Sequence, residues 1–180
     1  MKLKFFLLLL ISANSFSKNP YIEHYAFITS EKYPDTALEY LRVNASTNTY
    51  AAYMLGQVYL RGLFGKQDNL LARRYFEVAA SKNMPDAINA IADGYYSGDI
   101  YQKDIGQALK YYEKAAKLGF GPSQFQAGIV LLNNYKTKSD LQRAIHYLRQ
   151  ASKNRKDLGE VADASLQYIN KAKKLLQSYK

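Results

Sequence analysis

The amino-acid sequence predicts an all-α fold, an α-solenoid in which helix–loop–helix repeats are stacked between two capping segments. The first observation behind this prediction is an internal repeat, because three segments align without a gap when the chain is shifted by 36 positions, as at Asp68, Asp104 and Asp140. The second is spacing, since the recurring small and aromatic residues lie three, four or seven positions apart, as on one face of a helix. The composition suits a compact domain, because 48% of the 180 residues are hydrophobic and 22% are charged.

Residues 1–17 are predicted to be a signal peptide. Lys2 and Lys4 precede an apolar run over 5–11, and small or polar residues continue to Ser17, after which cleavage is expected. The alternative is an uncleaved anchor, but this run is far shorter than the roughly 20 residues that span a bilayer. The mature protein is therefore expected in the periplasm or outside the cell, without a transmembrane segment.

Residues 18–47 are predicted to form an N-terminal cap built from a partial repeat. The segment 35–46, DTALEYLRVNAS, follows the pattern of the second helix of the unit, with alanines and a tyrosine at matching positions. Before it, 21–30 is expected to form part of a first helix. A stacked array needs such terminal segments because they cover its last apolar surface and present a polar outer side.

Residues 48–155 are predicted to contain three complete units, each with a first helix, a loop and a second helix. A small residue in the first helix marks a close helix crossing, because glycine there costs about 1 kcal/mol relative to alanine unless packing requires it. The first helix ends at a residue that tolerates the left-handed conformation, and an aspartate then caps the second helix. Alanines on the second helix allow close approach, and a tyrosine between them fills the space beside the contact. In that order, the registers are Gly56, Ala92 and Gly128; Gly62, Gly98 and Asn134; Asp68, Asp104 and Asp140; Ala72, Ala108 and Ala144; Tyr75, Tyr111 and Tyr147.

The paired tyrosines of the middle unit, Tyr111 and Tyr112, are predicted to be packing material rather than a binding site. The first tyrosine recurs in every unit, whereas Phe76 and Leu148 occupy the position of the second. We therefore expect the second position to require only bulk. Any recognition site should then lie on the first helices, where the units differ.

Residues 156–180 are predicted to form a C-terminal cap, with one lysine-rich helix over 158–179. The formal net charge is +10, and it falls to +8 once Lys2 and Lys4 are removed with the signal peptide. Much of the excess lies near the C-terminus, and two explanations for it stay open. Cations near the end of a helix complement its dipole, and a basic exported protein also makes weak contact with an anionic envelope surface.

The repeats resemble the Sel1-like repeat family, which is related to the tetratricopeptide repeat. The resemblance is carried by AAYMLGQVYLRG followed by DNLLARRYFEVAASKN, and by DAINAIADGYYSG followed by DIGQALKYYEKAAKLG. A period of 36 residues favours the Sel1-like form over the tetratricopeptide unit, whose period is about 34 residues. The resemblance implies a right-handed α-solenoid like the tetratricopeptide superhelix. It also implies that the motif residues are structural, and that the protein is an adaptor for protein complexes.

The residue types that support catalysis or metal binding are scarce, so the chain is predicted not to be an enzyme. Cysteine is absent, which excludes disulfides and thiolate metal sites. The two histidines, His24 and His146, are far apart and have no partner at the spacing of a metal or catalytic site. No cofactor is expected, and nothing in the sequence indicates nucleic acid as a partner.

A partner-binding surface is predicted on the concave face of the solenoid, which first helices line and where residues that vary between units can give specificity. Aromatic anchors beside amide and carboxylate groups suit an extended peptide segment. The alternative is that Phe125, and the row of Leu60, Tyr96 and Leu132, belong to the core between units. The predicted surface consists of Tyr53, Gln57, Asn89, Asp93, Tyr96 and Phe125.

The predicted function is that of an exported bacterial adaptor or scaffold, which mediates protein–protein interaction through this concave face. The alternative is that the protein binds a component of the cell envelope, either an anionic lipid or peptidoglycan, or that it is an accessory factor of an enzyme. This second hypothesis is based on the positive charge of the protein, and it predicts that added salt weakens binding to the anionic envelope component.

Overall fold

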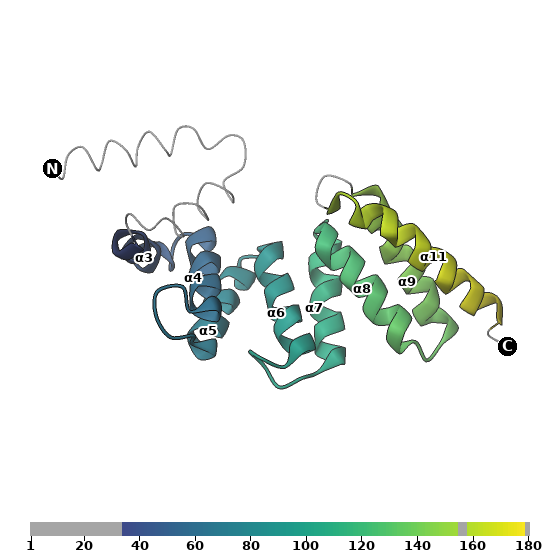
Figure 1. Cartoon of the computed structure of the whole chain (residues 1–180), viewed down its shortest axis with the longest axis horizontal. Helices are drawn as coiled ribbons and strands as arrows, with labels where there is room; N and C mark the ends of the chain where they lie inside the picture. The colour runs from purple at the N-terminus through teal and green to yellow at the C-terminus, as the bar shows by residue number, and fades with distance from the viewer. Residues whose placement is uncertain (1–33, 155–157, 179–180) are drawn as a thin grey trace.

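The computed structural model describes residues 34–154 and 158–178, and within these ranges the chain forms eight α-helices and no strand. The predicted all-α solenoid is confirmed, since the helices follow one another in a single row from the dark end of Figure 1 to the yellow end. The predicted signal peptide and the partial helix over 21–30 lie outside the described residues.

The row contains three helix pairs between two terminal helices, and each helix packs mainly on its neighbours along the chain. The C-terminal helix begins later than the predicted residue 158, because Gly159, with a φ of 50°, and Glu160 form a turn ahead of it. In chain order the helices are α3 (Pro34–Asn44), α4 (Thr49–Arg61), α5 (Asn69–Ser81), α6 (Pro85–Ser97), α7 (Ile105–Lys117), α8 (Gly121–Asn134), α9 (Lys138–Lys153) and α11 (Val161–Ser178).

The helix ends of the first two units are those that the sequence predicts. Asp68 caps α5 and accepts a hydrogen bond from the backbone N–H of Leu71 at 2.9 Å. Asp104 caps α7 in the same way. Gly62 and Gly98 end α4 and α6 in the left-handed conformation, with φ of 63° and 89°, which a residue without a Cβ adopts at no steric cost.

The third unit ends its first helix and begins its second differently, and two predictions about it are wrong. Asn134 is not left-handed; it is the last residue of α8, and its side-chain amide donates to the carbonyl of Val130 at 2.8 Å. Asp140 is not the N-cap of α9. That residue is Thr137, whose hydroxyl accepts from the backbone N–H of Asp140 at 3.1 Å, while the Asp140 carboxylate accepts from that of Thr137 at 3.0 Å. The reciprocal capping box lets α9 start ahead of the predicted position.

This capping box predicts a stability difference that depends on pH. Hydrogen bonds from the backbone of Lys136 and from Thr137 lower the pKa of Asp140. A carboxylate whose pKa is lower in the folded state stabilises that state above its unfolded pKa, and the contribution is lost as pH falls through the folded pKa. We expect Asp140→Ala to lower the free energy of unfolding by about 1 kcal/mol at neutral pH. The difference from the unaltered protein should shrink as the solution is acidified.

Urea titrations followed by circular dichroism at neutral and acidic pH measure this difference. Ser139→Ala is the matched control, because its side chain is exposed and takes no part in the capping box. A loss that stays constant down to the pH at which carboxylates are protonated would contradict the electrostatic explanation.

The close crossing between the two helices of a unit is confirmed. A Cβ atom added to Gly56 would lie 2.5 Å from the ring of Phe76, and one added to Gly128 would lie 2.5 Å from Cγ of Leu148. These distances are far shorter than a van der Waals contact of about 3.5–4 Å. The glycines are therefore required because a large second-helix side chain fills the space above them.

The first tyrosine of each second helix packs as predicted in the first two units. Tyr75 stacks on Tyr59 with ring centroids 5.7 Å apart, and Tyr111 stacks on Tyr95 at the same distance. The second aromatic position lies deeper, because Phe76 is fully buried and Tyr112 is only 1% exposed. The rings therefore form the seam between the two helices of a unit.

Candidate functional site

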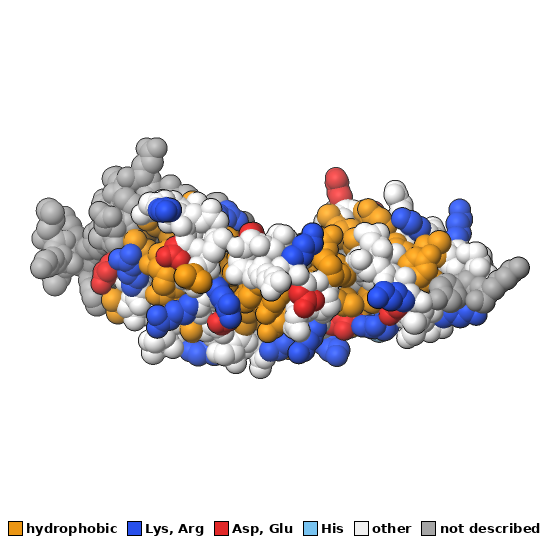
Figure 2. All heavy atoms as spheres, turned by 90° about the horizontal axis from the view of Figure 1, so that it is seen from below, with side chains coloured by type: hydrophobic (Ala, Val, Ile, Leu, Met, Phe, Trp, Pro, Cys, Tyr) orange, Lys and Arg blue, Asp and Glu red, His pale blue; other side chains and the backbone are white. Residues whose placement is uncertain are grey.

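The six predicted surface residues all lie on the first helices α4, α6 and α8, and none of them is buried. Figure 2 shows the elongated molecule from below, and its outline dips over the middle of the row, where α6 and α7 lie in Figure 1. The six side chains do not form one cluster. They divide into a pair on α4, a group on α6, and one residue on α8.

The pair on α4 is held against the core of the first unit. The side-chain amide of Gln57 donates to the hydroxyl of Tyr53 at 3.2 Å. The Tyr53 ring packs on Phe76 with centroids 5.9 Å apart. One side of this ring therefore belongs to the core, and its polar end faces the same way as Gln57.

The group on α6 forms a hydrogen-bonded network that joins three helices. Tyr112 on α7 donates its hydroxyl to Oδ1 of Asp93 at 2.6 Å, and Asn89 donates its amide to Oδ2 of Asp93 at 2.8 Å. Ser123 on α8 donates to Oδ1 of Asn89 at 2.7 Å. The predicted recognition residues Asn89 and Asp93 are therefore fixed by the neighbouring helices of the second and third units.

This network corrects the expectation that the position of Tyr112 requires only bulk. A buried hydroxyl needs a hydrogen-bond partner, and Tyr112 finds it in Asp93, which stands where the other units have Gln57 and Ile129. The middle unit is the one in which the buried ring carries a hydroxyl and the first helix supplies a carboxylate. Comparison of these two registers is the signal that would have found the pair from sequence.

The protein around Asp93 raises the pKa of both partners, Asp93 and Tyr112. Burial of the carboxylate raises the pKa of Asp93, although the hydrogen bond from Tyr112 opposes the shift, and the charge of Asp99 adds to it. Burial, followed by the hydrogen bond to Asp93, also raises the pKa of Tyr112, so this phenol remains a donor. Because the Asp93 residue is exposed at the surface while its carboxylate bonds to a buried hydroxyl, it stands at the boundary between core and solvent.

The two remaining aromatic residues differ in their surroundings. Tyr96 is 42% exposed, and its ring meets that of Tyr112 edge to face with centroids 6.5 Å apart. Phe125 meets Tyr168 of α11 edge to face at 5.8 Å. The capping helix therefore covers part of Phe125, as the alternative of a core position would require, whereas Tyr96 is open to a partner on the same helix as Asn89 and Asp93.

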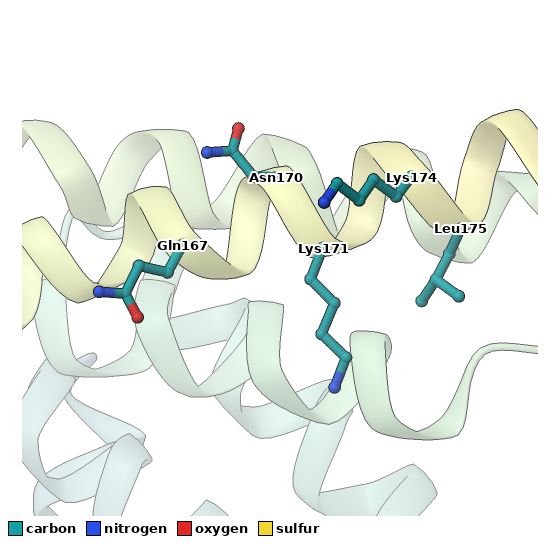
Figure 3. Close-up of a pocket in the computed structure, with 5 residues that line it drawn as sticks. All are labelled: Gln167, Asn170, Lys171, Lys174 and Leu175. Atoms are coloured by element: carbon teal, nitrogen blue, oxygen red, sulfur yellow. The ribbon is translucent and has the colours of Figure 1, made fainter.

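The lysine-rich face of α11 is the second candidate surface. Lys171, Lys173 and Lys174 are exposed. Figure 3 shows the residues that line a pocket on this helix, in which the side chain of Lys174 runs along the helix toward Asn170 while that of Lys171 extends away from the helix. They do not converge on a common point, so this face offers charge without a formed anion site. The lining residues are Gln167, Asn170, Lys171, Lys174 and Leu175.

Within the described part of the chain, no group of three His, Cys, Asp or Glu residues could hold a metal ion. No helix there has the length and hydrophobicity that a membrane span requires.

The chain is similar to one family and to several solved structures. The Sel1 repeat family matches residues 49–84, 85–120 and 122–155. The crystal structure of c5321, a protective antigen present in uropathogenic Escherichia coli strains displaying an SLR fold, is 27% identical, with a TM-score of 0.61 over 64% of this chain and 25% of that one. A Sel1 repeat protein from Oxalobacter formigenes is 22% identical, with a TM-score of 0.65 over 73% of this chain and 54% of that one, and shows the fold alone.

This chain therefore spans about a quarter of one structure and about half of the other. No curated protein matches it. The three consecutive matches cover more than half of the chain and coincide with the three helix pairs. Proteins built from such repeats are generally scaffolds for protein–protein interaction, and the fold is typically not enzymatic. The chain belongs to the Sel1 repeat family.

Proposed function

We propose that this protein is an exported scaffold that binds a protein partner through the surface of its first helices. The observation that carries the proposal is the group on α6, in which Asn89 and Asp93 are oriented by Ser123 and Tyr112 from two other helices. Polar groups that are already fixed lose little conformational freedom when a partner binds. The exposed ring of Tyr96 beside them supplies the kind of aromatic anchor that dominates binding energy in interfaces.

The differences between the units support a partner that is read along the row of first helices. At one half-buried register of the first helices, an aromatic residue, an amide and a second aromatic residue follow one another as Tyr53, Asn89 and Phe125. A symmetric or repetitive ligand would favour the same residue in every unit. The mixed surface suits a peptide segment of defined sequence.

The proposed surface is tested by a photo-crosslinking side chain placed at Tyr96, in cells that produce the protein. We expect irradiation to join the protein to a defined partner, because this ring is open to solvent and lies on the middle one of the three first helices. A crosslinker at Leu70 on α5 is the control, since that residue is 79% exposed but lies on a second helix. Equal products from both positions, or none from position 96, would refute the proposed surface.

Export is part of the proposal and rests on the sequence of residues 1–17. Mass spectrometry of the mature chain should find an N-terminus near Lys18, and fractionation should find the protein outside the cytoplasm. A chain that keeps Met1 and Lys2 and stays with the cytoplasmic fraction would remove export, while leaving the crosslinking result to decide the scaffold function.

A further inference from the structure

The charges of this basic protein are divided between the two sets of helices. The second helices α5, α7 and α9 carry nine lysines and arginines against three acids, whereas the first helices α4, α6 and α8 carry one arginine against two acids. The first-helix surface is therefore neutral to acidic although the whole chain has a formal charge of +10. The residues counted are Arg73, Arg74, Lys110, Lys114, Lys117, Lys138, Arg143, Arg149 and Lys153 with Glu77, Glu113 and Asp140; and Arg61 with Asp86 and Asp93.

Asp93 is the acid of this surface that lies in the hydrogen-bonded group. Each of its oxygens accepts one hydrogen bond, from Tyr112 or from Asn89. A carboxylate has about four lone-pair positions, so both oxygens can accept more. Arg73 forms an ion pair with Glu77, and Arg143 forms ion pairs with Glu113 and Asp140, and Asp93 takes part in neither group.

Among the residues that the structure describes, no positive charge compensates that of Asp93. Its strongest charged neighbour is Asp99, another acid, and burial raises the pKa of the Asp93 carboxyl. A cation brought by a partner would therefore meet a carboxylate that is partly removed from water and not yet neutralised, where electrostatic attraction is stronger than at an open surface.

Tyr96 adds an aromatic ring to this surface, because it lies one turn after Asp93 on the same helix face. Its ring is 42% exposed and touches Tyr112 edge to face. An aromatic face that is open to solvent attracts a lysine or arginine side chain, through its ring electrons and through contact with the aliphatic stem.

We propose that this surface binds a lysine or arginine side chain of a protein partner, with Asp93 as the counter-ion and Tyr96 as the aromatic wall beside it. The inference rests on the proposed function, because it assigns the chemistry of a segment bound by the first helices. Added salt should weaken this recognition only in part, since a partly buried charge pair is screened less than an exposed one.

The experiment is a selection of short random peptides, displayed on phage, by the purified protein and by two variants. Asp93→Asn removes the charge but keeps an oxygen to accept the Tyr112 hydroxyl, so the fold should survive, as circular dichroism would verify. Glu160→Gln is the matched control, because it removes one negative charge from an exposed position in the turn ahead of α11. We expect peptides selected by the unaltered protein and by Glu160→Gln to share a lysine or arginine at one position. Their affinity for Asp93→Asn should be about tenfold lower, and that variant should select without this preference.

Four other results would overturn the inference, and they differ in what they leave standing. Peptides that bind without a shared basic residue, or that bind Asp93→Asn equally well, would refute the cation site and keep the scaffold function. Failure of the unaltered protein to select any peptide would count against both. Self-association that is lost in Asp93→Asn, measured by sedimentation of the protein alone, would assign the site to a basic second-helix face of another copy instead.

Discussion

Phe76→Ala is expected to lower the free energy of unfolding by about 3–5 kcal/mol, the usual cost of removing a buried phenylalanine ring. Phe76 is fully buried, and it fills the space above Gly56, which has no side chain that could move into the cavity. The ring also supports Tyr53, at a centroid distance of 5.9 Å. Because each unit of a solenoid packs only on its neighbours, loss of this seam weakens the N-terminal end of the array first.

Urea unfolding followed by circular dichroism measures the effect, with Leu70→Ala as the control. Leu70 lies on the same helix but is 79% exposed, so its replacement should change the free energy of unfolding by less than about 0.5 kcal/mol. If Phe76→Ala costs no more than the control, the ring does not hold the two helices of the first unit together.

Gly128→Ala is expected to destabilise the third unit by about 1–3 kcal/mol, although alanine is the better helix former by about 1 kcal/mol. The added Cβ would lie 2.5 Å from Cγ of Leu148 and 3.3 Å from the backbone oxygen of Ala144. A rotation of the leucine side chain relieves the first contact but not the second, so α8 and α9 would have to move apart.

A double-mutant cycle with Leu148→Ala separates this overpacking from other effects of the substitution. When the leucine is already truncated, only the weaker contact with the backbone oxygen of Ala144 remains, and Gly128→Ala should cost clearly less than it does in the unaltered protein. Losses that simply add in the double variant would show that the distance between the two side chains is not the cause. Melting of each variant, followed by circular dichroism, gives the comparison.

The part of the fold that local physics determines could be predicted from the sequence. Asp68 and Asp104 cap helices through bonds to residues three positions ahead, and Gly62 and Gly98 end helices through their own backbone freedom. Each of these depends on a few neighbouring residues. Prediction from the repeat pattern failed in the third unit. There the pattern of the other units pointed to Asp140 as the cap, whereas the hydroxyl of Thr137 caps the helix instead.

The candidate site was predictable residue by residue but not as an arrangement. The varying registers of the first helices placed Asn89, Asp93 and Tyr96 together on α6, because helical spacing fixes which side chains share a face. The bonds from Tyr112 and Ser123 join residues 19 and 34 positions apart in the chain, so they depend on how α7 and α8 dock. The contact of Phe125 with Tyr168 also could not be predicted, because it depends on how α11 docks.

The third unit keeps the period of the array while dividing it differently between helix and loop. Its loop is residues 135–137, against 62–68 and 98–104 in the other units, and its helices contain 14 and 16 residues instead of 13 and 13. The spacing of the contact surfaces is thus what the array preserves, and loop residues can be exchanged for helical turns. For a designer who wishes to lengthen this protein, the middle unit is the module to duplicate, since its helices and loop have the same lengths as those of the first unit, whereas the third unit divides the period differently.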